Sequence, residues 1–128
     1  MIKQTYINDG TIISIDAMGG DQGVGAIIGG IARSLSGKNN LQFLIHGNKQ
    51  QLDEKIKNYP KILNVCSIIP CDSIVAMDEK PSSALRTGKG SSMWSSINSV
   101  STGKADIALS CGNTGALMAI SRFVLGTL

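Results

Sequence analysis

The sequence predicts an α/β fold in which a mainly parallel sheet carries helices on both faces. Short β-branched runs alternate with segments whose apolar residues recur at helical spacing, from residue 11 to residue 125. This alternation requires crossover connections, which place helices against the faces of a parallel sheet. Glycine-bearing or basic segments follow three of the predicted strands. Such segments meet at the carboxyl edge of a parallel sheet, where ligands bind.

The first half of the chain predicts three strands and two helices. The strands cover residues 11–15, 41–46 and 65–69, and the helices cover residues 24–35 and 49–58. The first strand ends at Asp16 and is followed by a glycine turn. The first helix has a one-sided apolar pattern, which is typical of a helix packed on a sheet. Pro60 ends the second helix and Pro70 ends the third strand.

The second half predicts a fourth strand and three helices. The strand covers residues 107–110, and the helices cover residues 82–86, 92–100 and 116–125. Pro81 suits the first turn of the short helix, since its fixed φ is already helical. Ser91 or Ser92 is expected to cap the next helix. The turn before the last helix reads Cys111-Gly112-Asn113-Thr114-Gly115.

The stretch MDEKPSSALRTGKGSSMW, residues 77–94, has the composition of an anion-binding segment. Between Lys80 and Ser92 it carries Lys80, Arg86 and Lys89, with serines, glycines and no carboxylate. It leads into a helix start, where free backbone amides and the helix dipole favour an anion. The alternative is an ordinary solvated, capped turn, because basic segments rich in serine and glycine are common.

Composition narrows the class of protein. The 128 residues are enough for one domain, with 42% hydrophobic and 16% charged residues. A net charge of +3 with 4% aromatic residues does not suggest a nucleic-acid-binding protein. Three cysteines without C-x-x-C spacing predict neither a zinc site nor a disulfide framework, and favour reduced thiols in the cytoplasm. No signal peptide and no apolar run of membrane-spanning length is evident.

The common phosphate-binding and nucleophile motifs do not fit. Each Gly-Lys pair lacks the following Ser or Thr of a P-loop, and Ile28 stands where a dinucleotide fingerprint needs its third glycine. Gly-x-Ser-x-Gly is absent, and His46 is the only histidine. We expect His46 to be a strand-end residue satisfied by neighbouring backbone. Cys111 is expected to be a small filler, with a nucleophile as the alternative.

Four motifs, in their order and spacing, resemble those of bacterial phosphate acyltransferases of the PlsX family. They are Asp16-Ala17-Met18-Gly19-Gly20-Asp21, Lys80-Pro81-Ser82-Ser83-Ala84, Gly90-Ser91-Ser92-Met93 and Gly112-Asn113-Thr114-Gly115-Ala116. The resemblance covers residues 11–128, with Val24 where many relatives have proline. It implies transfer of a fatty acyl group from acyl carrier protein to inorganic phosphate, giving acyl phosphate for phospholipid synthesis. It also implies an α/β/α sandwich similar to isopropylmalate dehydrogenase and phosphate acetyltransferase.

The resemblance further implies a homodimer that needs no metal and no cofactor. Family members run to well over twice this length. We therefore expect residues 1–128 to be the N-terminal part of a single phosphate acyltransferase domain, with the C-terminal half absent. The expected partners are acyl carrier protein with its acyl chain, inorganic phosphate and a second copy. Peripheral membrane association is not visible in the sequence.

Attack of phosphate on a thioester needs no protein nucleophile. The phosphate must be held in line with the carbonyl, and hydrogen-bond donors must face the oxyanion that forms. We expect Lys80, Arg86 and Asn113 to be catalytic. The residues expected to bind phosphate or substrate are Asp16, Gly19, Gly20, Asp21, Lys89, Ser91, Ser92, Thr114 and Gly115. Asp16 and Asp21 are expected to orient a cation or the loop, because carboxylates repel phosphate. The alternatives are a catalytically inert remnant and a phosphate-binding fragment without turnover.

Overall fold

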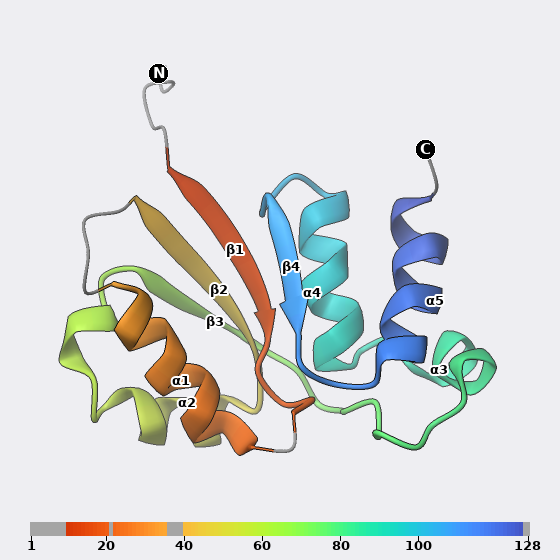
Figure 1. Ribbon diagram of the computed structural model, residues 1–128, viewed down its shortest axis with the longest axis horizontal. Coiled ribbons are helices and arrows are strands. Elements are labelled where there is room, and N and C mark those ends of the chain that lie inside the picture. The colour runs from red at the N-terminus through yellow and green to blue at the C-terminus, as the bar shows by residue number, and fades with distance from the viewer. Residues whose placement is uncertain (1–9, 21, 36–39, 127–128) are drawn as a thin grey trace.

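A four-stranded parallel sheet organises the chain. The computed structural model describes residues 10–20, 22–35 and 40–126. The strands are β1 (Thr11–Asp16), β2 (Leu41–Gly47), β3 (Cys66–Pro70) and β4 (Ile107–Ser110), in the spatial order β3-β2-β1-β4. All pairings are parallel, so the four arrowheads point to one edge in Figure 1. At that edge Asp16 lies opposite His46 on one side and Ser110 on the other.

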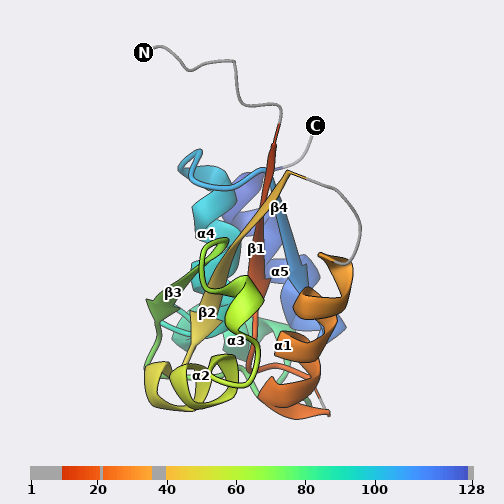
Figure 2. The same cartoon turned by 90° about the vertical axis from the view of Figure 1, so that its left-hand side faces the viewer.

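Helices cover both faces of the sheet. On one face lie α1 (Gly23–Ser34), α2 (Lys49–Ile56) and the short 3-10 helix η1 (Pro60–Ile62). On the other face lie α4 (Ser92–Ser101) and α5 (Thr114–Leu125), with α3 (Pro81–Thr87) beside α5. Figure 2 looks along the sheet and shows α1 and α4 on opposite sides of it. The predicted layered α/β fold is confirmed.

Each face of the sheet has its own apolar core. Between the sheet and the α1–α2 layer, the fully buried side chains are Ile28, Ile45, Leu52 and Ile62. On the other face they are Ala84, Met93, Ile97, Ala116 and Ile120. The helical spacing read from the sequence accounts for these sets, because residues three and four apart lie on one side of a helix. Burial of these aliphatic side chains is the main force that holds the helices on the sheet.

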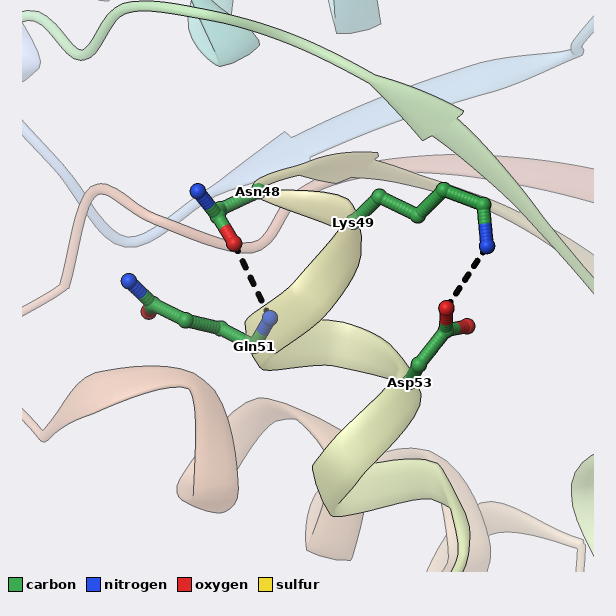
Figure 3. Close-up of polar contacts among 4 residues, drawn as sticks. All are labelled: Asn48, Lys49, Gln51 and Asp53. Atoms are coloured by element: carbon green, nitrogen blue, oxygen red, sulfur yellow. Dashed lines mark hydrogen bonds and ion pairs between the residues drawn. The ribbon is translucent and has the colours of Figure 1, made fainter.

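Local signals account for where the helices begin. Asn48 caps α2, where its side chain accepts a 2.9 Å hydrogen bond from the Gln51 amide (Figure 3). The last helix begins at Thr114, two residues earlier than predicted, because Asn113 caps it. The second helix ends at Ile56, two residues before the predicted end, and Pro70 is still paired as the last residue of β3. An edge strand tolerates a terminal proline, since its missing N–H need not face a neighbour.

The α1 side of β4 is uncovered. Ile107 and Leu109 are 46% and 51% exposed, although both belong to a strand of the sheet. A hollow of about 280 Å³ lies between β4 and α1, and Ile13, Ile27 and Leu109 are among its lining residues. Within the described residues, no helix has the length and apolarity needed to cross a bilayer.

Candidate functional site

Asp16 ties together three corners at the carboxyl edge of the sheet. Its Oδ1 accepts hydrogen bonds from the Ser92 hydroxyl at 2.6 Å and from the Met18 amide at 3.1 Å. Its Oδ2 accepts a 2.8 Å bond from the Ser110 hydroxyl. The bonds therefore join the end of β1, the start of α4 and the end of β4. Asp16 is 1% exposed, so its carboxylate holds these loops and does not face solvent.

The loops that follow β1 and β4 touch through glycines. A Cβ atom added to Gly19 would lie 2.7 Å from Asp16 Oδ2 and 3.0 Å from Gly112 Cα. One added to Gly20 would lie 3.2 Å from Cys111 Cβ. Because hydrogen bonds hold the Asp16 carboxylate and the Gly112 contact is with backbone, a side chain at Gly19 would push the two loops apart. Asp21, which was predicted together with these glycines, lies outside the described residues.

Ser91 and Ser92 begin α4 with buried hydroxyl groups. Ser91 is the cap, and its Oγ accepts a 3.1 Å bond from the Trp94 amide. The Ser92 hydroxyl is taken by Asp16, and its amide donates to the Ser73 carbonyl at 3.0 Å. The Ser91 oxygen and both the hydroxyl and the amide of Ser92 are thus engaged inside the protein. Both serines position the helix, and neither presents its hydroxyl to solvent.

Asn113 joins the β3–α3 loop to the start of α5. Its Oδ1 accepts a 3.1 Å bond from the Ala116 amide, which caps the helix. Its Nδ2 donates to the carbonyls of Ala76, at 3.0 Å, and Glu79, at 2.7 Å. Because an amide nitrogen has two hydrogens, no side-chain donor is left for an oxyanion. The first two amides of α5, at Thr114 and Gly115, have no partner in regular helix geometry, and both residues are exposed.

Lys80 stands beside this open helix start. It follows Glu79, whose carbonyl is bonded to Asn113, and it precedes Pro81, whose Cγ lies 3.0 Å from the Cβ position of Gly115. Lys80 is exposed and is the cap residue of α3, with no side-chain capping bond. Lys80, an exposed lysine, therefore lies in the same corner as two helix amides, and positive charge with free amides is the chemistry that an anion requires.

Arg86 and Lys89, the other two predicted cations, lie further along the chain in different surroundings. Arg86 is exposed in the last turn of α3. Lys89 lies in the α3–α4 turn and lines a hollow of about 250 Å³ along α4. Among the described residues the only ion pair joins Lys49 and Asp53 on α2, at 2.6 Å (Figure 3). The three cations predicted to hold phosphate are thus not neutralised by a carboxylate within ion-pair distance.

Glu79 adds a carboxylate to this region that the composition of residues 80–92 did not reveal. Its oxygens accept hydrogen bonds from the Ser83 and Thr87 hydroxyls, at 3.3 and 3.2 Å. They also accept a 3.4 Å bond from the Ala76 amide. These bonds hold the carboxylate against α3. The position of Glu79, directly before Lys80 in the sequence, was the available signal.

His46 has side-chain partners where backbone partners were expected. Its Nε2 lies 2.8 Å from Ser14 Oγ and its Nδ1 lies 2.7 Å from Ser95 Oγ. Burial lowers the pKa of His46 to about 4, partly opposed by the charge of Asp16. The ring is therefore neutral near neutral pH. Both serines are distant from His46 in the sequence, so local sequence patterns could not predict these hydrogen bonds.

No metal centre is formed by the part of the chain that the structure describes. There, no group of three or more His, Cys, Asp or Glu side chains is arranged to hold an ion. A hollow of about 570 Å³, lined by Lys49, Asp53 and Glu54 among others, follows the exposed side of α2. Exposed pairs such as Lys49–Asp53 contribute little to stability, so this hollow is ordinary charged surface.

Comparisons with known proteins place the chain in a family. The family model described as "Fatty acid synthesis protein" matches residues 11–128. A phosphate acyltransferase of Jannaschia sp. (strain CCS1) is 45% identical over 118 residues, which are 92% of this chain and 32% of that protein. One of Paracoccus denitrificans is 44% identical over 120 residues, and one of Caulobacter vibrioides is 43% identical over 114 residues.

The match is close but covers only part of these relatives. It takes in 94% of this chain for the Paracoccus protein and 89% for the Caulobacter protein. In both cases it spans 32% of the relative. The shared region contains every corner described above.

Proposed function

The chain belongs to the fatty acid synthesis protein family, and on that premise we propose that it transfers a fatty acyl group from acyl carrier protein to inorganic phosphate. The product is an acyl phosphate, used in phospholipid synthesis. The observation that supports the proposal is the corner where Lys80 lies beside the open amides of Thr114 and Gly115. Three unpaired thiols, Cys66, Cys71 and Cys111, favour a reducing compartment such as the cytoplasm.

In this mechanism phosphate is the nucleophile. Lys80 and the first amides of α5 hold the dianion, and Arg86 and Lys89 supply further positive charge at its approach. A phosphate oxygen forms a bond to the thioester carbonyl carbon, and the carbon–sulfur bond breaks. The carrier thiolate leaves and takes up a proton. Alignment of the reactants and stabilisation of the oxyanion supply the rate enhancement.

The buried polar residues position this corner and do not contact the reacting atoms. Asp16 and Ser92 fix the start of α4, and Asn113 fixes the start of α5. Asn113 therefore contributes through the amides that it places. Gly19 and Gly20 allow the β1 loop to approach the β4 loop. The proposed substrates are acyl carrier protein and phosphate, and the proposed assembly is a homodimer.

A phosphate-binding fragment without turnover is the second candidate. The chain spans 32% of the length of the curated relatives it matches. In addition, the exposed side chains of Ile107 and Leu109 leave one face of β4 open. Lys80, Thr114 and Gly115 all belong to this chain, so the corner can bind phosphate whether or not an acyl group is transferred.

Two measurements on the 128-residue chain separate these candidates. The first is formation of acyl phosphate from acyl carrier protein and phosphate, trapped as the hydroxamate with hydroxylamine. The second is thermal unfolding with and without phosphate, because a ligand at about 100 times its Kd stabilises the folded state by about 2.7 kcal/mol. Acyl phosphate supports the transferase. Protection without acyl phosphate supports the binding fragment. If neither acyl phosphate nor thermal protection is found, both candidates are contradicted.

The variant Lys80→Ala tests whether thermal protection by phosphate arises at the corner formed by Lys80, Thr114 and Gly115. We expect it to lose most of the effect of phosphate on the unfolding midpoint. Lys104→Ala is the matched control, since Lys104 is also exposed but precedes β4, at the opposite edge of the sheet. Equal loss of protection in both variants would show a general charge effect and would refute the site.

A further inference from the structure

A serine, a histidine and a second serine form an oriented hydrogen-bond chain between β1, β2 and α4. The Ser14 hydroxyl donates to the Ser96 carbonyl at 2.8 Å, so only its lone pairs face His46. His46 Nε2 must therefore carry the proton of the neutral ring. Nδ1 is then an acceptor, and the 2.7 Å contact is a bond donated by the Ser95 hydroxyl.

This arrangement has the three parts of an activated nucleophile. Ser95 is the hydroxyl, His46 is a base within hydrogen-bond distance, and Ser14 orients the base from its other nitrogen. His46 and Ser14 are fully buried, which holds the ring in one orientation. Since burial lowers the pKa of His46 to about 4, the Nδ1 lone pair is free of a proton at neutral pH.

Ser95 opens onto a hollow that suits a small acyl compound. The hollow holds about 250 Å³ and is lined by Lys89, Gly90, Trp94, Ser95 and Asn98. Ser95 and Asn98 lie three residues apart, on the same side of α4. Lys89 and Asn98 supply a positive charge and amide hydrogens beside the hydroxyl, as a developing oxyanion requires. The volume lies below the usual range for ligand pockets, which restricts the donor to a short chain.

We propose that Ser95, with His46 as its base, is a nucleophilic site that accepts a short acyl group from an activated ester or thioester. The Ser95 oxygen forms a bond to the carbonyl carbon, and its proton passes to His46 Nδ1. The bond from that carbon to the leaving oxygen or sulfur breaks, and His46 returns the proton to the leaving group. An O-acyl serine and a free alcohol or thiol result.

The neighbouring thiol does not compete. Cys71 contacts Ser95, and burial raises the pKa of this thiol although the Ser95 bond opposes the shift. Cys71 therefore stays protonated at neutral pH and is a weak nucleophile. The proposal does not depend on phosphate binding at Lys80. Lys89 is the residue that the two proposals share, and the labelling of Ser95 is measured without phosphate.

The test uses a fluorophosphonate probe on the full 128-residue chain. An activated serine forms a bond to phosphorus and expels fluoride, and peptide mass spectrometry locates the adduct. We expect the native chain to carry the probe on Ser95 and the urea-unfolded chain to carry none. Acetylation by p-nitrophenyl acetate should occur at the same residue. An unmodified Ser95, an adduct on Cys71, or equal labelling in urea would overturn the proposal.

Three variants then test the base. Ser95→Ala should abolish labelling, and His46→Gln should slow it about a hundredfold, the usual contribution of a general base. Ser101→Ala removes an exposed serine of the same helix and should leave the rate unchanged. Equal rates for His46→Gln and the unaltered chain would refute the role of His46. Circular dichroism checks each fold. If His46→Gln does not fold, the native and urea-unfolded comparison decides.

Discussion

Asp16 and Ser92 are joined by a 2.6 Å hydrogen bond, although 76 positions separate them in the sequence. The bond links the last residue of β1 to the first residue of α4. The end of β1 and the start of α4 lie at the same edge of the sheet in Figure 1. A carboxylate beside a helix start also interacts favourably with the helix dipole. This buried contact therefore sets the position of the helix that follows the basic α3–α4 turn.

Replacing Asp16 by Asn should destabilise the fold. The substitution keeps the shape but removes the charge that strengthens the bonds from Ser92, Ser110 and the Met18 amide. Bonds to charged groups contribute about 1.5–3 kcal/mol, so we expect a loss of about 2 kcal/mol. Urea unfolding followed by circular dichroism measures this loss.

Asp53→Asn is the matched control for that variant. It removes the same charge, but from an exposed ion pair with Lys49, so we expect a change below about 1 kcal/mol. If the urea midpoint of Asp16→Asn is as high as that of Asp53→Asn, the buried carboxylate does not stabilise the contact between β1, β4 and α4.

Gly19→Ala should disrupt the contact between the β1 and β4 loops. The new methyl group would meet Asp16 Oδ2 at 2.7 Å and Gly112 Cα at 3.0 Å, and the second contact is with backbone that cannot rotate away. Overpacking of this kind costs about 1–3 kcal/mol. Phosphate protection should weaken as well, since Gly112 leads into the α5 start.

Gly30→Ala provides the comparison. Nothing lies within 4 Å of the position of its new methyl group, and Gly30 lies inside α1. Alanine is favoured over glycine in a helix by about 1 kcal/mol, so the variant should be as stable as the unaltered chain or more so. A neutral Gly19→Ala would mean that the two loops can separate without cost.

The layered fold was predictable because its signals are local. Strand length, β-branched composition and helical spacing lie within ten or so residues of one another, and they placed the four strands and the main helices. Even the cap of α4 was narrowed to two neighbouring serines. Ser91 takes that role because its φ and ψ are extended while Ser92 is already helical.

The use of the polar side chains was not predictable in the same way. A carboxylate, two serines and an asparagine at one sheet edge can hold a ligand or can hold each other. Asp16 and Ser92 bond to one another, and Asn113 bonds to carbonyls 34 and 37 positions away. Such partners depend on how loops pack in space. The sequence pointed first to the start of α4, but there the hydroxyl and the amide of Ser92 are bonded within the protein.

Stability should fall in mild acid because of His46. Its pKa is about 4 in the folded chain and about 6.5 when exposed, so the unfolded chain binds more protons between these values. The contribution is therefore complete above about pH 6.5 and is lost as pH falls towards 4. Linkage gives a loss of about 2 kcal/mol between about pH 7 and pH 5.

The measurement compares urea unfolding of the unaltered chain and His46→Gln across this range. The difference between the two free-energy curves gives the contribution of the imidazole, because the carboxylates contribute equally to both. His46 is the only histidine, so its proton resonances also report the folded pKa directly. A folded pKa at or above 6.5 would contradict a buried neutral ring.

Leu109→Lys should reduce self-association of the chain. Among the residues that the structure describes, β4 pairs only with β1, which leaves its outer edge open, and Ile107 and Leu109 are exposed on the side of α1. Open edges with apolar side chains promote pairing with another chain, and an edge lysine opposes it. Sedimentation velocity over a range of concentrations measures the effect. Leu63→Lys adds the same charge at an exposed leucine beside η1, at the β3 side of the sheet and away from β4, so general repulsion is matched. If both variants reduce association equally, or if the unaltered chain stays monomeric throughout, the β4 edge is not the associating surface.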